Sequence, residues 1–423
     1  MNPSQASVII TTTDGNALTE LCGISMLDRL LRILQRLGVG EAAIVTTDVR
    51  LIAEHLAKRA WARSEIGVTI CASCESPPAA RTLVIAAAYH DSRLLGALLE
   101  QTRTTVLVDS APPSAMQPLL EPAAHDQLGY FCGAAMVEAE WLTRAADLQD
   151  LFDRLGATAG RGEVALLDVD RQPAYVVALR SVIRPLWFPT PKPEQVARAE
   201  RLILDSAQNG TLDLPAKLHG PIETWIIARL CRTAITPMRI TLFTAAVSVV
   251  VTLLFASGQL VAGTLLALAV GILDGLDGKQ ARVKVETTQL GKREHVLDYV
   301  LELSWWMALA FHFTASAQVQ NAYAFLALLA GSDVVDRLAK KQAKHVTGRN
   351  LDDVAPIDRF VRLIGGRRNI YIWIFAAGLV FGAPDKAFIA LCCWGALTAA
   401  VHSLRALSLN RQLRGARSKG AAH

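Results

Sequence analysis

The chain has 423 residues, enough for two or three domains of about 150 residues each. Hydrophobic residues make up 52% of it, charged residues 19%, and the mean hydropathy is +0.31. These values exclude a purely soluble enzyme and predict a membrane portion. The net charge is only +5, but the basic residues are unevenly distributed along the chain.

The first residues, MNPSQASVIITTTDG, lack a basic segment followed by a long apolar run. We therefore expect no cleavable signal peptide and a cytoplasmic N-terminus. The cysteines are scattered, and Cys71 and Cys74 form one CxxC without a second pair or a nearby histidine to complete a zinc site. We interpret them as ordinary reduced thiols.

Residues 1–184 have the pattern of an α/β domain. Short apolar runs rich in β-branched residues predict strands at 7–13, 41–48, 104–110 and 163–170. Residues 24–39 have apolar side chains at helical spacing, which predicts an amphipathic helix that ends near Gly38. Because strand, helix and strand follow one another at this spacing, we expect a parallel sheet of βαβ units.

Residues 185–218 are predicted to form a linker and a connecting helix. The stretch RPLWFPTPKP contains four prolines, which disfavour a helix or a central strand. The stretch 193–210 is then expected to be the connecting helix. Residues 219–237 are amphipathic and are a candidate for a helix that lies in the membrane interface.

The region 219–410 contains six apolar segments, each about long enough to cross ~30 Å of hydrocarbon. They lie at 239–257, 260–277, 297–315, 319–338, 369–383 and 386–406. The loops at 257–260 and 315–320 carry no Lys or Arg, whereas the loops on the other side and the basic tail at 411–423 carry many. The positive-inside rule then predicts six transmembrane helices of a bacterial-type inner membrane protein, with both termini cytoplasmic. The alternative, one large soluble helical domain, does not explain why Lys and Arg residues are concentrated in alternate loops.

The stretch GILDGLDGKQARVKVETTQLGKREHVLDYVLE (271–302) places acidic residues at the ends of two of these segments. Asp274 and Asp277 share one helix face, and Asp298 and Glu302 share another. Carboxylates at membrane depth are costly and usually face a bundle interior or a polar cavity. Two converging carboxylate pairs need positive charge between them, and hard oxygen ligands suit Mg²⁺ or Mn²⁺, so we expect a site for two divalent ions.

The remaining residues of this stretch are typical of a phosphoryl-transfer site. Gly278 leaves space for a ligand against the backbone, Ala281 is small, and Arg282 can neutralise phosphate. Gly291 opens space at the entry to the next helix. Metal ions at such a site polarise a diphosphate, and the fourth acid takes a proton from an attacking hydroxyl.

This stretch resembles the motif of the CDP-alcohol phosphotransferases, integral membrane enzymes with six transmembrane helices. The family pattern is D-x2-D-G-x2-A-R, about eight residues, and then G-x3-D-x3-D. The matching positions are Asp274, Asp277, Gly278, Ala281, Arg282 and Gly291. The stretch TAITPMRIT (233–241) is similar to the family's lead-in to its first membrane helix, so the resemblance covers about residues 219 to 408.

The second half of the motif departs from the family pattern, because His295 and Tyr299 stand where the family has aspartates. An acid pair with the right mutual spacing follows three residues later, as Asp298 and Glu302, which we interpret as an insertion close to one helical turn. Glu294 and His295 remain alternative ligands.

The resemblance implies a transferase that moves a substituted phosphate group from a CDP-alcohol to an acceptor hydroxyl and releases CMP. The implied metal ligands are Asp274, Asp277, Asp298 and Glu302. The implied CDP-binding residues are Asp274, Gly278, Ala281, Arg282 and Gly291. Glu302 is the implied general base. The alternatives are a catalytically inactive membrane scaffold and, less favoured, a transporter, whose acids would lie nearer the bilayer middle.

Arg367 and Arg368 precede the fifth apolar segment, where family members that use phosphorylated polyols as acceptors have arginines, and Arg337 and Asp336 are further candidates. The resemblance favours a phosphorylated polyol such as an inositol phosphate over a plain amino alcohol, although positive-inside anchoring alone also explains these arginines. We expect membrane lipids and a second copy of the chain as partners, and no nucleic acid.

The order of strand, helix 24–39 and strand in the N-terminal half resembles the sugar-phosphate nucleotidyltransferases, which occur fused to this membrane domain and make the CDP-alcohol. Such enzymes need a Gly-rich loop with an arginine, and then a lysine, to hold a triphosphate. Here TTTDGNALTELCGISML follows the first strand, and no basic residue precedes Arg29. Asp109 alone is a weak match to a metal-binding acid. We therefore expect a catalytically degenerate domain that serves assembly, regulation or dimerisation.

Overall fold

In the computed structural model of the chain, the residues form two compact units, and each unit is described by itself. The structure describes residues 7–12, 15–58, 60–73, 80–120, 125–126, 128–177, 179–208, 213–286 and 291–420. The first unit comprises Met1–Gln208, Ala228–Ala234 and Gln280–Thr287. The second unit comprises Asn209–Ile227, Ile235–Lys279 and Thr288–His423. Cys74 of the predicted CxxC lies outside the described residues.

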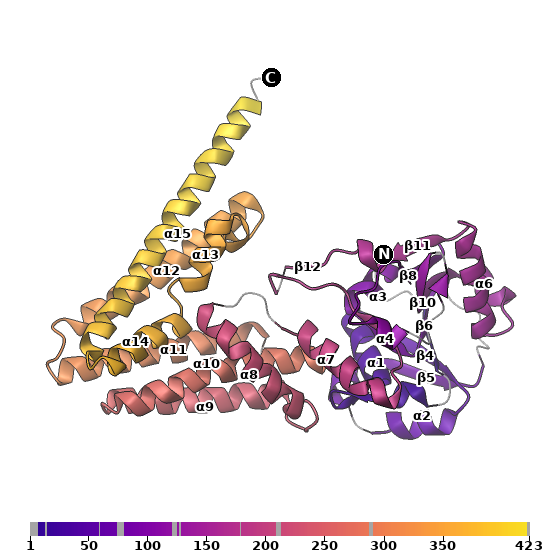
Figure 1. Cartoon of the computed structure of the whole chain (residues 1–423), viewed down its shortest axis with the longest axis horizontal. Helices are drawn as coiled ribbons and strands as arrows, with labels where there is room; N and C mark the ends of the chain where they lie inside the picture. The colour runs from indigo at the N-terminus through magenta and orange to yellow at the C-terminus, as the bar shows by residue number, and fades with distance from the viewer. Residues whose placement is uncertain are drawn as a thin grey trace. The chain divides into compact units, whose positions relative to one another are not determined.

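The first unit is built on one mixed sheet whose strand order is β11-β8-β10-β6-β1-β4-β5, with β9 paired to β10 (Figure 1). Its strands are β1 (Ser7–Thr12), β4 (Glu41–Thr46), β5 (Gly67–Cys71), β6 (Arg81–Ala86), β8 (Thr105–Asp109), β9 (His125–Asp126), β10 (Gly129–Glu138) and β11 (Ala165–Asp168). Strand β1 pairs in parallel with β4 and β6, β4 with β5, and β8 with β11. The predicted parallel α/β sheet is confirmed, and the four strands predicted from sequence are present. Strand β10, which runs antiparallel between β6 and β8, was not predicted.

Helices cover both faces of this sheet, with α6 on one side and α1 and α3 on the other (Figure 1). The helices of the first unit are α1 (Met26–Arg36), α2 (Val49–Leu56), α3 (Ser92–Leu99), α4 (Gln117–Leu120), α5 (Ala139–Arg144), α6 (Leu148–Gly160) and α7 (Val196–Ser206). Helix α1 begins where the Ser25 side chain accepts a hydrogen bond from the Asp28 amide, and it ends before Gly38, whose φ of 86° suits glycine. The predicted end of this helix is confirmed. Leu151 and Leu155 of α6 are buried against Val106 of β8.

Short strands complete the first unit. They are β2 (Glu20–Leu21), β3 (Ile24–Ser25), β7 (Ala88–His90), β12 (Tyr175–Val176), β13 (Ser181–Val182) and β14 (Trp187–Pro189). Strand β14 lies in the stretch expected to be a linker, yet it pairs with β7, and its Trp187 is fully buried. The packed part of the domain therefore extends beyond the expected boundary at 184. A proline is tolerated here because a strand at the edge of a small sheet needs few amide donors.

The second unit is helical. It contains α8 (Leu214–Leu230), α9 (Pro237–Ala256), α10 (Leu260–Val283), α11 (Gly291–Ala315), α12 (Ala322–Thr347), α13 (Pro356–Ile364), α14 (Arg368–Val380) and α15 (Pro384–Gly420), of which the ends of α8 and α10 belong to the first unit. A helix lies at each of the six predicted apolar segments. Among the residues that the structure describes, three helices are long and apolar enough to cross a membrane, namely Pro237–Ala256, Leu260–Val283 and Pro384–Gln412. Helix α14 is apolar but has only 13 residues.

Aromatic side chains form the centre of the helical core. Trp305 and Phe313 of α11 are fully buried, and Phe313 contacts Phe375 of α14 and Phe388 of α15. Helix α9 begins at Pro237, preceded by Thr236, whose side chain caps the Arg239 amide. This is the stretch that resembles the family's lead-in, and its threonine followed by proline is a standard way to start a helix.

His90 of β7 makes the stability of the first unit depend on pH. The ring is buried, its Nε2 lies 2.8 Å from the Cys132 carbonyl oxygen, and burial lowers the pKa of His90 to about 4. An unfolded histidine has a pKa of about 6.5 and so binds its proton first as the pH falls, which removes stability from about pH 6.5 downward.

We expect the free energy of unfolding to fall between pH 7 and pH 4.5, with about 2–3 kcal/mol of that loss due to His90. Urea denaturation followed by circular dichroism in detergent measures this loss. His90→Gln carries no titrating ring, so its loss over the same range should be smaller by that amount. An equal loss in both proteins would contradict the assignment to His90.

Candidate functional site

The predicted acidic residues lie on two helices of the second unit. Asp274 and Asp277 are on α10, and Asp298 and Glu302 are on α11. Helix α10 continues unbroken to Val283, so the positions of the first half of the motif follow one another along a single helix. Gly291 is the first residue of α11. The side chains of Glu294 and His295 lie outside those that the structure describes.

Arg368, the first residue of α14, is the positive charge among these acids. Its Nη2 atom lies 2.6 Å from Oδ2 of Asp274, and its side chain is only 14% exposed. The guanidinium also interacts electrostatically with Glu302 and Asp298, and it lies 5.9 Å from the ring centre of Trp305. Asp274 therefore pairs with an arginine that sequence reasoning had assigned to the acceptor phosphate, and the same arginine interacts electrostatically with Asp298 and Glu302.

Asp277, the fourth acid, is held from helix α9. Its Oδ2 accepts a hydrogen bond of 2.7 Å from the Thr241 hydroxyl, and its Oδ1 accepts one of 2.6 Å from the Gly278 amide. Sequence reasoning included Thr241 in the lead-in stretch but gave it no role. The hydroxyl keeps the Asp277 carboxylate in a defined orientation on α10.

Arg337 of α12 is placed beside α11. Its Nε donates to Oδ2 of Asp333 at 2.7 Å, its guanidinium lies 4.7 Å from the ring centre of Tyr299, and it interacts electrostatically with Glu302. Asp333 was not predicted as a site residue. Arg337 keeps 62% of its side chain exposed. The prediction that it binds an acceptor phosphate is therefore compatible with its ion pair to Asp333. Arg367 stands at the N-cap of α14.

A second face of α10 is packed against α8. A Cβ atom on Gly275 would lie 2.7 Å from a carboxylate oxygen of Glu223, and one on Gly271 would lie 3.4 Å from the His219 ring. Lys279 follows on the same face, with its Nζ 3.5 Å from Oε2 of Glu223 and 2.9 Å from the Thr224 hydroxyl. Small residues four apart allow two helices to approach closely, and Gly271 and Gly275 were the signal that sequence reasoning missed.

The ion pair between Glu223 and Lys279 is buried, with side-chain exposures of 6% and 1%. Lys279 stands inside the motif, directly after Gly278. The opposite face of α8 exposes Leu218, Ile222 and Trp225, which is the amphipathic pattern expected of an interface helix. The Glu223–Lys279 ion pair therefore fixes the rotation of α10 relative to α8 and does not involve Asp274 or Asp277.

The donor set suits a hard divalent ion in its chemistry, since Asp274 and Asp277 offer carboxylate oxygens one turn apart on α10. Among the described residues, no group of three or more His, Cys, Asp or Glu side chains lies close enough to hold a metal ion. The positive charge beside Asp274 is instead Arg368. The two-ion site remains a prediction.

Arg282, the last residue of the first half of the motif, belongs to the first unit. Its Nε donates to the Ala207 carbonyl oxygen at 2.7 Å, just after the end of α7.

Two features of the first unit bear on the predicted loss of nucleotidyl transfer. Asp109, considered as a metal-binding acid, is fully buried and accepts hydrogen bonds from both terminal nitrogens of Arg184 and from the Trp187 indole. Both of its carboxylate oxygens are thus already paired.

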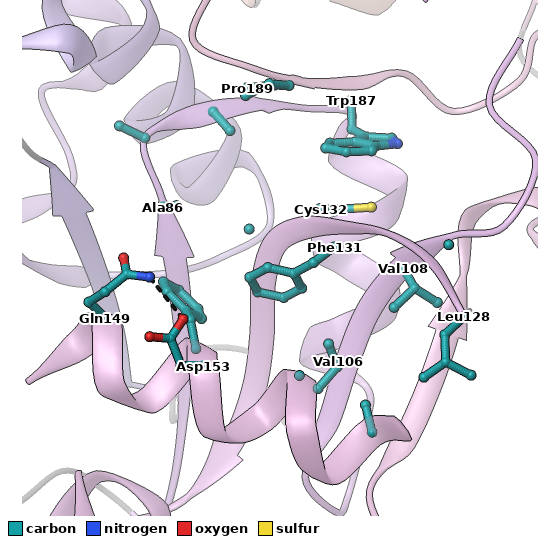
Figure 2. A pocket seen from close by; sticks show the side chains of 17 residues that line it. Ala86, Val106, Val108, Leu128, Phe131, Cys132, Gln149, Asp153, Trp187 and Pro189 are labelled. Carbon is teal, nitrogen blue, oxygen red and sulfur yellow. Dashed lines mark hydrogen bonds between the residues drawn. The ribbon is translucent and has the colours of Figure 1, made fainter. Parts of the chain in front are cut away.

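The other feature is a cavity of about 440 Å³ between the sheet and α6. Figure 2 shows Phe131 and Val106 on one side of this cavity, Trp187 at another, and Gln149 bonded to Asp153 on α6. Among the described residues that line it there is no Lys or Arg. The described part of the lining therefore has no basic side chain of the kind that holds a triphosphate.

The comparisons with known proteins agree with the motif. Residues 234–335 match the family model for CDP-alcohol phosphatidyltransferase, which confirms the resemblance of the helical region.

Two curated relatives are each named "Bifunctional IPC transferase and DIPP synthase". The protein of Aquifex aeolicus is 26% identical over 208 residues, covering 48% of this chain and 47% of the relative. That of Thermococcus kodakarensis is 31% identical over 146 residues, covering 34% and 33%. The chain thus spans about half or less of the length of these relatives.

Two solved structures are among those that this chain is similar to. HddC from Yersinia pseudotuberculosis is 12% identical with a TM-score of 0.32, covering 46% of this chain and 98% of that one. The UDP-glucose pyrophosphorylase of Acinetobacter baumannii is 7% identical with a TM-score of 0.34, covering 48% and 95%. Likenesses of this size carry no information on activity.

The buried ion pair gives a stability prediction. Lys279→Met leaves the Glu223 carboxylate buried without its charge partner, which costs about 3–5 kcal/mol. We expect a clear drop in the unfolding temperature of the detergent-solubilised protein, measured by intrinsic fluorescence. Adding Glu223→Gln should recover part of that loss. Arg144→Met breaks an exposed pair with Glu140 and should shift the temperature little. Similar shifts in Lys279→Met and Arg144→Met would contradict the buried pair.

Proposed function

We propose that the protein is an integral membrane enzyme that transfers a substituted phosphate group from a CDP-alcohol to an acceptor hydroxyl and releases CMP. One observation carries the proposal: Asp274, an acid within the region that matches the family model, pairs with the guanidinium of Arg368, which also interacts electrostatically with Asp298 and Glu302. Acids collected at one end of apolar helices are costly unless they bind something positive.

The four acids Asp274, Asp277, Asp298 and Glu302 would hold two Mg²⁺ or Mn²⁺ ions, which when bound polarise the diphosphate and stabilise charge on the departing CMP. Gly278, Ala281, Arg282 and Gly291 would bind the CDP group. Glu302 would take the proton of the attacking hydroxyl. Arg368 is also available to a phosphate, because a guanidinium has five donors and Asp274 uses part of them.

The proposed acceptor is a phosphorylated polyol such as an inositol phosphate, bound by Arg367, Arg368 and Arg337. The curated relatives, which are named for an IPC transferase and a DIPP synthase, support this class of acceptor. The proposed setting is a bacterial-type inner membrane crossed six times, with the first unit and the acids on the cytoplasmic side. The product then enters the synthesis of phospholipids or polar headgroups, and the enzyme works as a homodimer in contact with membrane lipids.

A catalytically inactive scaffold is the second candidate. It is favoured by the pairing of Asp274 with Arg368 and by the unusual second half of the motif. A scaffold would bind neither divalent ions nor CDP. A transporter is less well supported, because the motif places its glycine, alanine and arginine directly beside the acids.

The proposal is tested by CMP release from purified protein with a panel of CDP-alcohols and acceptors, including inositol phosphate, in Mg²⁺ or Mn²⁺ and in EDTA. We expect metal-dependent CMP release that falls by about 10²–10⁴-fold in Glu302→Gln, since a general base contributes that much. Asp277→Asn should be similarly impaired, whereas Asp385→Asn, an acid of α15 outside the motif, should retain activity.

The outcomes separate the assignments. Loss in Asp277→Asn without loss in Glu302→Gln would move the base to Glu294, His295 or Asp298. No CMP with any pair of substrates, together with no metal-dependent binding of CDP, would reject the enzyme and favour the scaffold.

A further inference from the structure

The end of helix α10 is part of the first unit, together with the residues that follow it up to 287. This segment comes directly after Ala281 and Arg282 of the motif. The last carbonyl groups of a helix have no partners within the helix and must bond elsewhere. The hydrogen bonds accepted by the carbonyl groups at the end of α10 therefore show what holds Ala281 and Arg282 in place.

Two buried arginines of α1 bind the carbonyls at this helix end. Arg29, 2% exposed, donates from Nη1 to the Val283 oxygen at 2.6 Å and from Nη2 to the Leu21 oxygen at 3.0 Å. Arg32, 7% exposed, donates from Nη1 to the Lys284 oxygen at 2.7 Å and lies 3.3 Å from Oε1 of Glu286. Cations at a helix C-terminus also complement the negative end of its dipole.

The backbone here has an uncommon conformation. Val285 has a φ of 51°, in the left-handed region that a β-branched residue rarely adopts. The Glu286 amide donates to the Ala281 oxygen at 2.9 Å, which is the closing bond of a Schellman motif, and glycine is the usual residue at the position that Val285 takes. Such a conformation persists only where the surroundings hold it in place.

Other bonds hold the same segment. Lys284 donates from Nζ to the Thr233 oxygen at 2.6 Å, and Arg282 donates to the Ala207 oxygen. Val283 is fully buried. The two arginines of α1 are distinct among these contacts because they come from the α/β sheet domain and bind the carbonyls on either side of the helix end.

We propose that Arg29 and Arg32 are positioning residues for the transferase, and that this is a present role of the N-terminal α/β domain. They are the first basic residues after strand β1, where a triphosphate-binding loop would need positive charge. They bind the end of α10 instead, and so hold Ala281 and Arg282 in the orientation that binds the CDP diphosphate. The link to CDP rests on the proposed function, whereas the hold on α10 does not.

The test uses the full chain with Arg29→Met and Arg32→Met, singly and together. We expect the KM for the CDP-alcohol and the Kd for CDP to rise at least tenfold in the double variant, with a smaller change in kcat. Arg63→Met is the matched control, because Arg63 is a partly buried arginine that pairs with Asp28 of the same helix α1 and is not among the residues that bind the end of α10. Its KM and Kd should stay within about twofold of wild type.

A second readout does not depend on activity. Trypsin cleaves after Arg282 and Lys284, and cleavage requires the helix end to open. Mass spectrometry of limited digests should show at least tenfold faster cleavage at these two positions in the double variant and no change in Arg63→Met. Val285→Gly, which removes the backbone strain, should restore part of the CDP affinity in the double variant.

Unchanged cleavage in the double variant would overturn the proposal, as would an equal loss of CDP affinity in Arg63→Met. If the wild-type protein releases no CMP and binds no CDP, the proposed function fails. Faster cleavage in the double variant would then still support the hold of α1 on α10, and unchanged cleavage would still overturn it.

Discussion

The buried charge of Arg368 is the constraint on which the candidate site depends. Asp274 lies 2.6 Å from this guanidinium, which also interacts electrostatically with Asp298 and Glu302. Without a positive partner these acids would repel one another in surroundings that solvate charge poorly. Arg368 offsets part of this repulsion, and its five donors allow it to bind a phosphate as well as Asp274.

Helix α10 carries the first half of the motif, from Asp274 to Arg282, and several contacts hold this helix in place. On one face, the Glu223–Lys279 pair and the glycines at 271 and 275 fix its packing against α8. On another face, Thr241 orients Asp277. At its end, arginines of α1 bind the last carbonyls. Each contact involves a motif residue or one within three positions of it, so the placement of the motif depends on partners that are distant in sequence.

Local sequence patterns predicted those helices and strands whose formation depends on residues that are close together in the chain. The parallel sheet, helix 26–36 and a helix at each of the six apolar segments follow from periodicity and hydropathy. Strand β10 and the burial of Trp187 were missed, because the first is set by its neighbours in the sheet and the second by pairing with β7 and Asp109. At the site, Asp274 and Arg368 were both named, but their pairing was not, since nothing in either segment indicates the other. Thr241, Asp333 and Glu223 were missed for the same reason.

The central claim is that these acids bind a divalent ion together with CDP. Electron paramagnetic resonance of Mn²⁺, titrated into purified protein with and without CDP, tests it most directly, with Asp274→Asn as the comparison. Binding of Mn²⁺ that tightens with CDP in the wild type and weakens at least tenfold in Asp274→Asn is the predicted result. Equal binding in both proteins, or no Mn²⁺ binding in the presence of CDP, would contradict the claim.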